Sequence, residues 1–134
     1  FNRIYQTFDG IYHDIALKLG LSDSGFVILY TICETGDGCL QKDLSTMLSM
    51  SKQTINSSIR KLEKDDFLTL TSGKGRQMHI YLTPKGRQFC EKKIFPLIAM
   101  ENKAFSCMKK DECNLMLKLF NDYCQALKDS ISKL

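Results

Sequence analysis

The apolar residues in the first third of the chain follow a helical spacing. Those within residues 1–19 are three or four positions apart: Ile4, Phe8, Ile11, Tyr12, Ile15 and Leu19. This spacing predicts an amphipathic helix that ends at Gly20. Ser22 is a typical N-cap residue for a second helix that extends to about Glu34, and the glycines around Asp37 predict a turn after it.

The middle of the chain changes to two short helical patterns and then to alternation. Leucine and methionine predict a short helix over residues 44–48, and a second helix is predicted from Ser51 to about Asp65. Two short helices joined by a tight turn form a helix-turn-helix. Residues 67–71 and 77–82 alternate and are separated by a loop rich in glycine, which predicts a β-hairpin. A helix-turn-helix followed by a hairpin is a winged helix.

The last third of the chain is predicted to be helical. Thr83 and Pro84 fit the N-cap and first position of a helix to about Ser106, which Pro96 should kink or split. A final helix is predicted over residues 111–131, with apolar residues near heptad spacing. The fold class is therefore mainly α with a small β-hairpin wing. We expect three parts: N-terminal helices at 1–34, a winged helix-turn-helix lobe at 35–88 and C-terminal helices at 89–134.

Positive charge is concentrated in the predicted winged helix. Residues 40–87 hold nine Lys or Arg and four acids, a net +5, whereas the remaining residues hold ten bases and eleven acids, a net −1. A local basic surface suits a polyanion such as double-stranded DNA. A charged stretch is also common on an ordinary solvated surface, so charge alone leaves both interpretations open.

The predicted 51–65 helix has the composition of a DNA-reading helix. Ile55, Ile59 and Leu62 share one face, and the other carries hydrogen-bonding and basic side chains without an acid through residue 62. Side chains near the start of such a helix reach base edges, and later cations contact phosphate. The loop between the strands adds further basic residues that suit a minor groove or the DNA backbone. The candidate DNA-binding residues are Ser51, Lys52, Gln53, Thr54, Asn56, Ser57, Arg60, Lys61, Lys64, Lys74 and Arg76.

The sequence contains no motif typical of a metal site or an enzyme, and only weak indications of a redox site. The two histidines and six cysteines form no CxxC pair, HExxH, GxSxG or P-loop pattern, so we expect no metal, no cofactor and no enzyme activity. We interpret the cysteines as small buried apolar residues, and the alternative is a redox sensor at Cys33 or Cys39. The sequence shows no secretory signal or spanning segment and begins at Phe1 rather than Met, so we expect a cytoplasmic protein whose natural N-terminus precedes residue 1.

Several motifs in a fixed order resemble the MarR family of bacterial transcription regulators. They are Leu19-Gly20-Leu21-Ser22 with Phe26-Val27-Ile28-Leu29, Asp43-Leu44-Ser45 with Leu48, Ser51-x-x-Thr54-Ile55 with Arg60-Lys61-Leu62-Glu63-Lys64-Asp65, and Arg76 through Leu82-Thr83-Pro84-Lys85-Gly86. The resemblance covers essentially the whole chain. It implies a homodimer that binds a pseudo-palindromic operator, with a role as a repressor. A winged-helix protein-interaction module without DNA binding is the alternative.

The resemblance also implies a dimer interface and a mechanism that releases the protein from DNA. The dimerisation candidates are Ile4, Phe8, Ile11, Ile15, Met116, Phe120, Tyr123 and Leu127. Similar regulators are released from DNA by small aromatic ligands or by oxidation, and Tyr12, His13 and Tyr30 either line such a ligand cavity or belong to the core. Two positions depart from the family pattern: Lys74 replaces an Asp that often braces the wing arginine, and Lys109 replaces a Ser or Thr cap. The wing is therefore expected to be more mobile and more basic.

Overall fold

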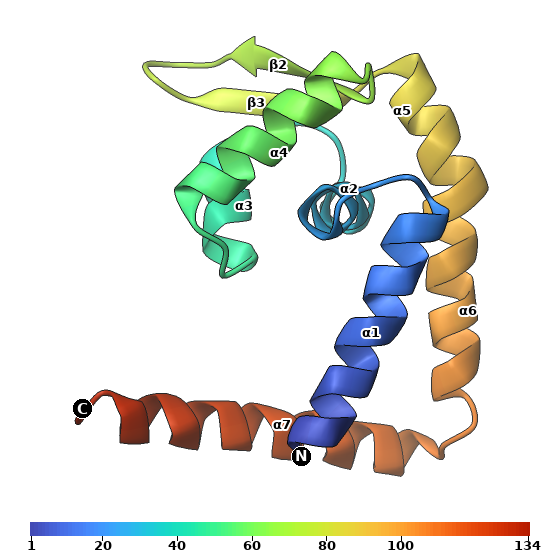
Figure 1. The fold of residues 1–134 in the computed structure, drawn as a ribbon, viewed down its shortest axis with the longest axis vertical. Coiled ribbons are helices and arrows are strands. Elements are labelled where there is room, and N and C mark those ends of the chain that lie inside the picture. The colour runs from blue at the N-terminus through green and yellow to red at the C-terminus, as the bar shows by residue number, and fades with distance from the viewer. The chain divides into compact units, whose positions relative to one another are not determined.

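The computed structural model describes residues 1–134 and is mainly helical, with one small antiparallel sheet (Figure 1). The predicted fold class is confirmed. The chain divides into two compact units, Phe1–Pro96 and Leu97–Leu134. In chain order the elements are α1 (Asn2–Lys18), α2 (Asp23–Thr35), β1 (Cys39–Leu40), α3 (Gln41–Met47), α4 (Lys52–Lys64), β2 (Leu68–Ser72), β3 (Met78–Leu82), α5 (Pro84–Phe89), the π-helical η1 (Cys90–Ile94), α6 (Phe95–Phe105) and α7 (Lys110–Ile131).

Hydroxyl side chains begin three helices of the first unit, α2, α4 and α5, where the sequence predicts. Ser22 Oγ accepts a hydrogen bond from the Gly25 amide at 3.1 Å, and Ser51 Oγ accepts one from the Thr54 amide at 3.1 Å. Thr83 Oγ1 accepts from the Gly86 amide at 2.9 Å, with Pro84 at the first helical position. Each bond satisfies an amide that has no partner inside its helix, which fixes the helix start.

The sheet has the strand order β1-β3-β2. Strands β2 and β3 form the predicted hairpin, with Leu70 opposite Ile80. Strand β1, which the sequence analysis missed, pairs Cys39 with Ile80 on the other edge of β3. Two residues are too short a segment for alternation to be visible, so only the tertiary pairing reveals this strand.

The core of the first unit lies between α2, α3, α4 and the sheet. All three apolar residues predicted for the inner face of α4 are buried, as is Leu44 of α3. Their burial supplies the main stabilisation of short helices that would be marginal alone. The core cluster consists of Ile28, Leu29, Ile32, Leu44, Ile55, Ile59, Leu62, Leu68 and Ile80.

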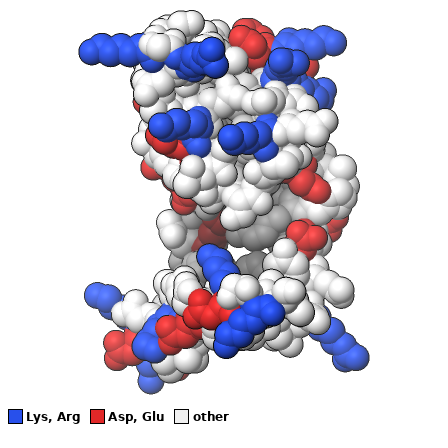
Figure 2. Space-filling view, turned by 90° about the vertical axis from the view of Figure 1, so that its left-hand side faces the viewer, with Lys and Arg blue, Asp and Glu red and all other residues white.

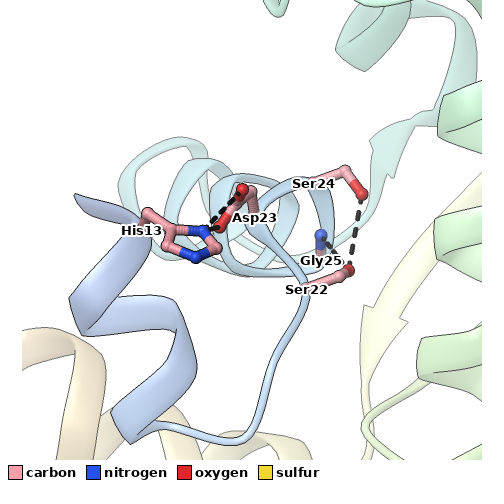
Figure 3. A network of polar contacts seen from close by, with 5 residues as sticks. All are labelled: His13, Ser22, Asp23, Ser24 and Gly25. Carbon is pink, nitrogen blue, oxygen red and sulfur yellow. Dashed lines mark hydrogen bonds and ion pairs between the residues drawn. The ribbon is translucent and has the colours of Figure 1, made fainter. Parts of the chain in front are cut away.

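Polar contacts join the start of α2 to α1 and α4. His13 Nδ1 lies 2.8 and 3.0 Å from the two carboxylate oxygens of Asp23 (Figure 3). On the other side of the helix start, Ser24 Oγ lies 2.7 Å from Ser58 Oγ of α4. Because Ser58 is only 8% exposed, this bond satisfies one of the few polar side chains inside the lobe. The start of α2 is thus tied to α4.

The predicted break in the helix from Pro84 is present, but it lies just before Pro96. Residues 90–94 form a π-helical turn, in which the Phe95 amide bonds to the Cys90 carbonyl. A proline donates no amide hydrogen and its ring collides with the carbonyl four residues earlier. The wider turn is the local adjustment expected ahead of such a residue.

The second unit consists of most of α6 and the whole of α7, and no residue in these two helices is buried. Glu112 closes the start of α7 by accepting a hydrogen bond from the Lys109 amide at 2.7 Å, so the helix begins without the usual Ser or Thr. No single helix in the chain is both long and apolar enough to cross a membrane; α1 and α2 pass that test only as a pair bent by 88°.

Candidate nucleic-acid interface

The outer face of α4 is polar, basic and exposed. All nine of its predicted DNA-binding residues are exposed, including Gln53, Asn56 and Arg60. Some of these groups already have local partners. The Ser51 and Thr54 hydroxyls lie 2.8 Å apart, and Ser57 Oγ donates to the Thr54 carbonyl at 3.0 Å. Lys61 Nζ lies 3.3 Å from Asp65 Oδ2, a surface pair that holds Lys61 only weakly.

Asn56 has a partner that the sequence analysis did not identify. Gln41, the first residue of α3, donates its Nε2 hydrogen to Asn56 Oδ1. This bond joins the two helices of the helix-turn-helix on their outer side. The Asn56 amide nitrogen and the second lone pair of its oxygen stay available for another group. Gln41 is therefore placed to orient Asn56.

The hairpin is fixed at its base by the turn that follows α2. Asp37 Oδ1 accepts from the Leu82 amide at 2.7 Å, and Asp37 Oδ2 pairs with Arg87 at 2.8 Å. His79 Nδ1 lies 2.9 Å from the Gly38 carbonyl oxygen. These contacts bind β3 and the start of α5 to one turn. The sequence analysis predicted that turn but gave Asp37 no role.

The wing tip is a short loop beyond the last hairpin hydrogen bond. The Gly73 amide donates to the Gln77 carbonyl at 2.8 Å, so only residues 74–76 extend past it. Lys74 and Arg76 are both exposed there, and Gly75 has a φ of 67°, which favours glycine. The tip thus presents two cations on three residues.

A cleft of about 760 Å³ lies between α3, α4 and the wing. It brings Lys52 and Asn56 of α4 together with Arg76 of the wing, three residues that the sequence predicted separately. Lys42 and Thr46 of α3 also line it and are additions to the predicted site. The sequence held a signal for them, because the first helix of a helix-turn-helix usually crosses the DNA backbone. The space-filling view shows lysine and arginine side chains projecting from this side of the first unit (Figure 2).

The aromatic residues predicted for a ligand cavity form a row of ring contacts. Tyr12 lies with its ring centroid 6.4 Å from Phe8 and 6.3 Å from Phe26, and Phe26 lies 5.9 Å from Tyr30. Phe26 is buried at 2% exposure. His13 is exposed and faces Asp23 rather than these rings. The contacts account for Tyr12 and Tyr30 as packing between α1 and α2, and their role in ligand binding stays a prediction.

The interpretation of all six cysteines as buried apolar residues is wrong. Only Cys90 is buried; Cys107 and Cys124 are exposed in the second unit, where neither α6 nor α7 buries a residue. Burial raises the pKa of the Cys39 thiol, opposite to the direction that makes a reactive sensor. Cys33 is partly buried, and the neighbouring Cys90 and burial raise the pKa of its thiol.

The candidate dimerisation residues include large apolar side chains that are exposed within one chain. In α1, Ile4, Phe8 and Ile11 are 52% to 59% exposed, and Ile15 is half-buried. In α7, Phe120, Tyr123 and Leu127 are 43% to 45% exposed, and Met116 is half-buried. Each helix therefore carries an apolar face.

Comparison with known proteins shows a resemblance to one family. The sequence matches the family model of the MarR family over residues 19–77. The segment from residue 19 to residue 77 thus resembles the MarR family in sequence. The match extends from the end of α1 through α2, α3, α4 and β2 into the wing loop, and it includes all the predicted DNA-binding residues. A search of curated proteins found no match.

Solved structures share the fold along nearly the whole length of this chain. A MarR family regulator from Neisseria meningitidis superimposes with a TM-score of 0.84 at 19% identity, covering 98% of this chain and 93% of that one. A putative MarR family regulator from Listeria monocytogenes, solved with a 26mer DNA, gives a TM-score of 0.74 at 24% identity, covering 96% and 87%. A Staphylococcus aureus MarR in complex with salicylate and kanamycin gives 0.73 at 19% identity, covering 96% and 88%.

Proposed function

We propose that this chain is a sequence-specific DNA-binding transcription regulator of the MarR family that acts as a repressor. The cleft that joins Lys52 and Asn56 of α4 to Arg76 of the wing carries the proposal. A helix with hydrogen-bonding side chains beside a basic loop can contact base edges and backbone at once. The similar Listeria regulator solved with DNA supports the same partner.

The residues divide into two roles in this proposal. Gln53 and Asn56, near the start of α4, read base edges in the major groove, because residues at this end of a recognition helix reach the bases. Arg60, Lys64 and the two wing cations contact phosphate or the minor groove. The cations supply most of the affinity and the polar residues supply the discrimination between sequences.

We further infer that the chain binds DNA as a homodimer. The exposed apolar faces of α1 and α7 need a cover, and a second copy of the chain would place two recognition helices about 34 Å apart on a pseudo-palindromic site. In this arrangement residues 1–34 and 89–134 hold the dimer and residues 35–88 bind DNA. Leu127→Asp should shift the chain from dimer to monomer in sedimentation, whereas Lys128→Asp on the same helix should leave it unchanged. An unchanged mass for Leu127→Asp would contradict this role of α7.

The DNA-binding experiment begins with selection of bound sequences from a random DNA pool. The affinity of the selected site is then measured by fluorescence anisotropy at increasing salt. Each phosphate that a cation no longer neutralises lowers the slope of log affinity against log salt by about 0.9. Arg76→Ala should lower it by about twice that in a dimer, and Lys133→Ala, the same change in charge at an exposed site in the second unit, should not.

Base reading is tested by comparing selected with random DNA. Asn56→Ala should lower the affinity for the selected site by roughly 1–3 kcal/mol and leave random binding nearly unchanged. Asn114→Ala, the same substitution at an exposed asparagine of α7, is the matched control. Equal losses on both DNAs would contradict base reading by Asn56, and a salt-independent affinity would favour a protein-interaction module instead.

The proposal includes release from DNA by a small aromatic ligand, which the Staphylococcus aureus MarR solved with salicylate supports. Salicylate is therefore the first probe. It should weaken binding to the selected site, and titration without DNA should show binding to the protein directly. Absence of binding at millimolar salicylate would contradict this switch for that ligand class.

A further inference from the structure

The polar side chains at the start of α4 differ in how many hydrogen-bonding groups they keep for another molecule. The Ser51 and Thr54 hydroxyls lie 2.8 Å apart, and the Ser57 hydroxyl donates to the Thr54 carbonyl at 3.0 Å. These hydroxyls already have partners within their own helix. The carboxamides of Gln53 and Asn56, which are both exposed, carry more donors and acceptors than a hydroxyl. The carboxamides are therefore the stronger base-reading groups of this helix.

Asn56 is held in one orientation by a residue of another helix. Gln41, the half-buried first residue of α3, donates its Nε2 hydrogen to Asn56 Oδ1, and both residues line the cleft beside the wing. A turn of the Asn56 carboxamide by 180° would bring its Nδ2 donor against the Nε2 donor of Gln41, so the hydrogen bond would be lost. The bond therefore fixes which side of the Asn56 carboxamide carries the acceptor.

We propose that the Gln41–Asn56 pair selects an adenine in each half-site of the operator. The inference rests on the proposed function, and it adds the identity of one base that the protein recognises. After the bond from Gln41, Asn56 keeps one lone pair on Oδ1 and both hydrogens on Nδ2. In the major groove, adenine presents its N6 amino donor beside its N7 acceptor. Oδ1 accepts from N6 and Nδ2 donates to N7, so one base makes both bonds.

The other three bases leave part of the Asn56 carboxamide without a partner. Guanine presents two acceptors, N7 and O6, so Oδ1 would face O6 with no hydrogen between the two oxygens. Cytosine offers only its N4 donor, and thymine offers only its O4 acceptor beside a methyl group. A polar group that loses water on binding and gains no hydrogen bond lowers the affinity. Adenine is therefore the preferred base.

The two residues have separate roles in this recognition. Asn56 contacts the base, and Gln41 is a positioning residue that acts through Asn56. Both side chains are neutral, so their loss should change the preference between bases and leave the salt dependence of the affinity unchanged. Replacing the selected adenine by guanine in one half-site should lower the affinity roughly 5- to 150-fold, the range that a good bidentate contact provides.

The first step of the experiment locates the base that Asn56 contacts. Each base pair of one half-site of the selected duplex is changed in turn, and the affinities of the unmodified chain and of Asn56→Ala are measured by fluorescence anisotropy. The contact is the position where a change weakens binding of the unmodified chain but not of Asn56→Ala. We expect adenine at that position.

The second step tests the two hydrogen bonds with altered bases at the same position. 7-Deazaadenine lacks the N7 acceptor, and purine lacks the N6 amino group. Each should weaken binding of the unmodified chain roughly 2- to 10-fold, the contribution of one hydrogen bond, and neither should weaken binding of Asn56→Ala. This comparison separates direct contact from any effect of the altered base on the duplex itself.

The third step tests the positioning role of Gln41. Gln41→Ala should lower the preference for adenine over guanine at this position about tenfold, and it should leave the affinity for random DNA and the thermal midpoint nearly unchanged. Gln88→Ala, the same substitution at an exposed glutamine of α5, should leave the preference intact. A preference that survives in Gln41→Ala would contradict the positioning role.

Three results would overturn recognition of adenine. They are a preference for another base at the position located with Asn56→Ala, the absence of any such position, and equal losses with the altered bases for both proteins. Sequence-specific binding with any of these results contradicts this inference and leaves the proposed function standing. A chain that binds neither selected nor random DNA contradicts both.

Discussion

Gly86 lies where the start of α5 touches the chain that leads into β2. A Cβ added to Gly86 would lie 1.8 Å from the Phe67 carbonyl oxygen and 2.8 Å from its carbon. The neighbour is backbone, and it cannot rotate away as a side chain tip would. The same carbonyl accepts a hydrogen bond from the Thr83 amide at 3.1 Å. Gly86→Ala must therefore separate two segments and disturb that bond.

The size of the effect follows from three contributions. Overpacking of this kind costs about 1–3 kcal/mol, and a weakened hydrogen bond costs about 1 kcal/mol more. Alanine is favoured over glycine in a helix by about 1 kcal/mol, which offsets part of the loss. We expect a net loss of about 1–3 kcal/mol in the free energy of unfolding, a large fraction of the stability of an ordinary domain.

Thermal unfolding followed by circular dichroism measures this loss. The midpoint of Gly86→Ala should fall by roughly 10 °C, since one kcal/mol corresponds to a few degrees for a chain of this size. Gly10→Ala is the matched control, because nothing lies within 4 Å of its added Cβ on α1 and the helix should gain stability. A midpoint for Gly86→Ala equal to that of the unmodified chain would show that α5 does not press on Phe67.

Variants at three further positions test interactions that the structure reveals. Asp37→Asn keeps an acceptor for the Leu82 amide and should cost less than about 1 kcal/mol in urea unfolding, whereas Asp37→Ala removes both acceptor oxygens and should cost about 1–2 kcal/mol; equal costs would mean that the hydrogen bond contributes nothing. Ser58→Ala leaves Ser24 without its partner and should lower stability by about 1 kcal/mol, with no loss on Ser57→Ala. Gln41→Ala should lower discrimination by Asn56 by about tenfold without changing the salt slope; a changed slope would place Gln41 on the DNA backbone instead.

Local signals in the sequence predicted most of the helices and the hairpin. Ser22, Ser51 and Thr83 are N-caps in the structure because each hydroxyl reaches an amide only three residues away. The inner face of α4 was also predictable, since helical periodicity alone places Ile55 and Ile59 on the same side. These features depend on residues close together in the chain.

The features that the sequence did not predict depend on distant partners. Strand β1, for example, exists only through its pairing with β3. The same reason explains why Gln41 was missed. Its side chain gains a role only when α3 and α4 are placed beside each other, and nothing in its sequence neighbours distinguishes it from any exposed glutamine.

Lys74 changes what the sequence predicts about the mobility of the wing, but the wing keeps its basic tip. Lys74 replaces the Asp that would brace the wing arginine, which predicts a looser hairpin. The structure holds the hairpin at its base through Asp37 and closes it at Gly73, where an added Cβ would lie 2.7 Å from the His79 ring. The effect of Lys74 is therefore confined to the three residues beyond that closure. Two cations on so short a tip can follow the phosphates of a groove without a fixed side-chain geometry, which favours affinity over base selectivity at the wing.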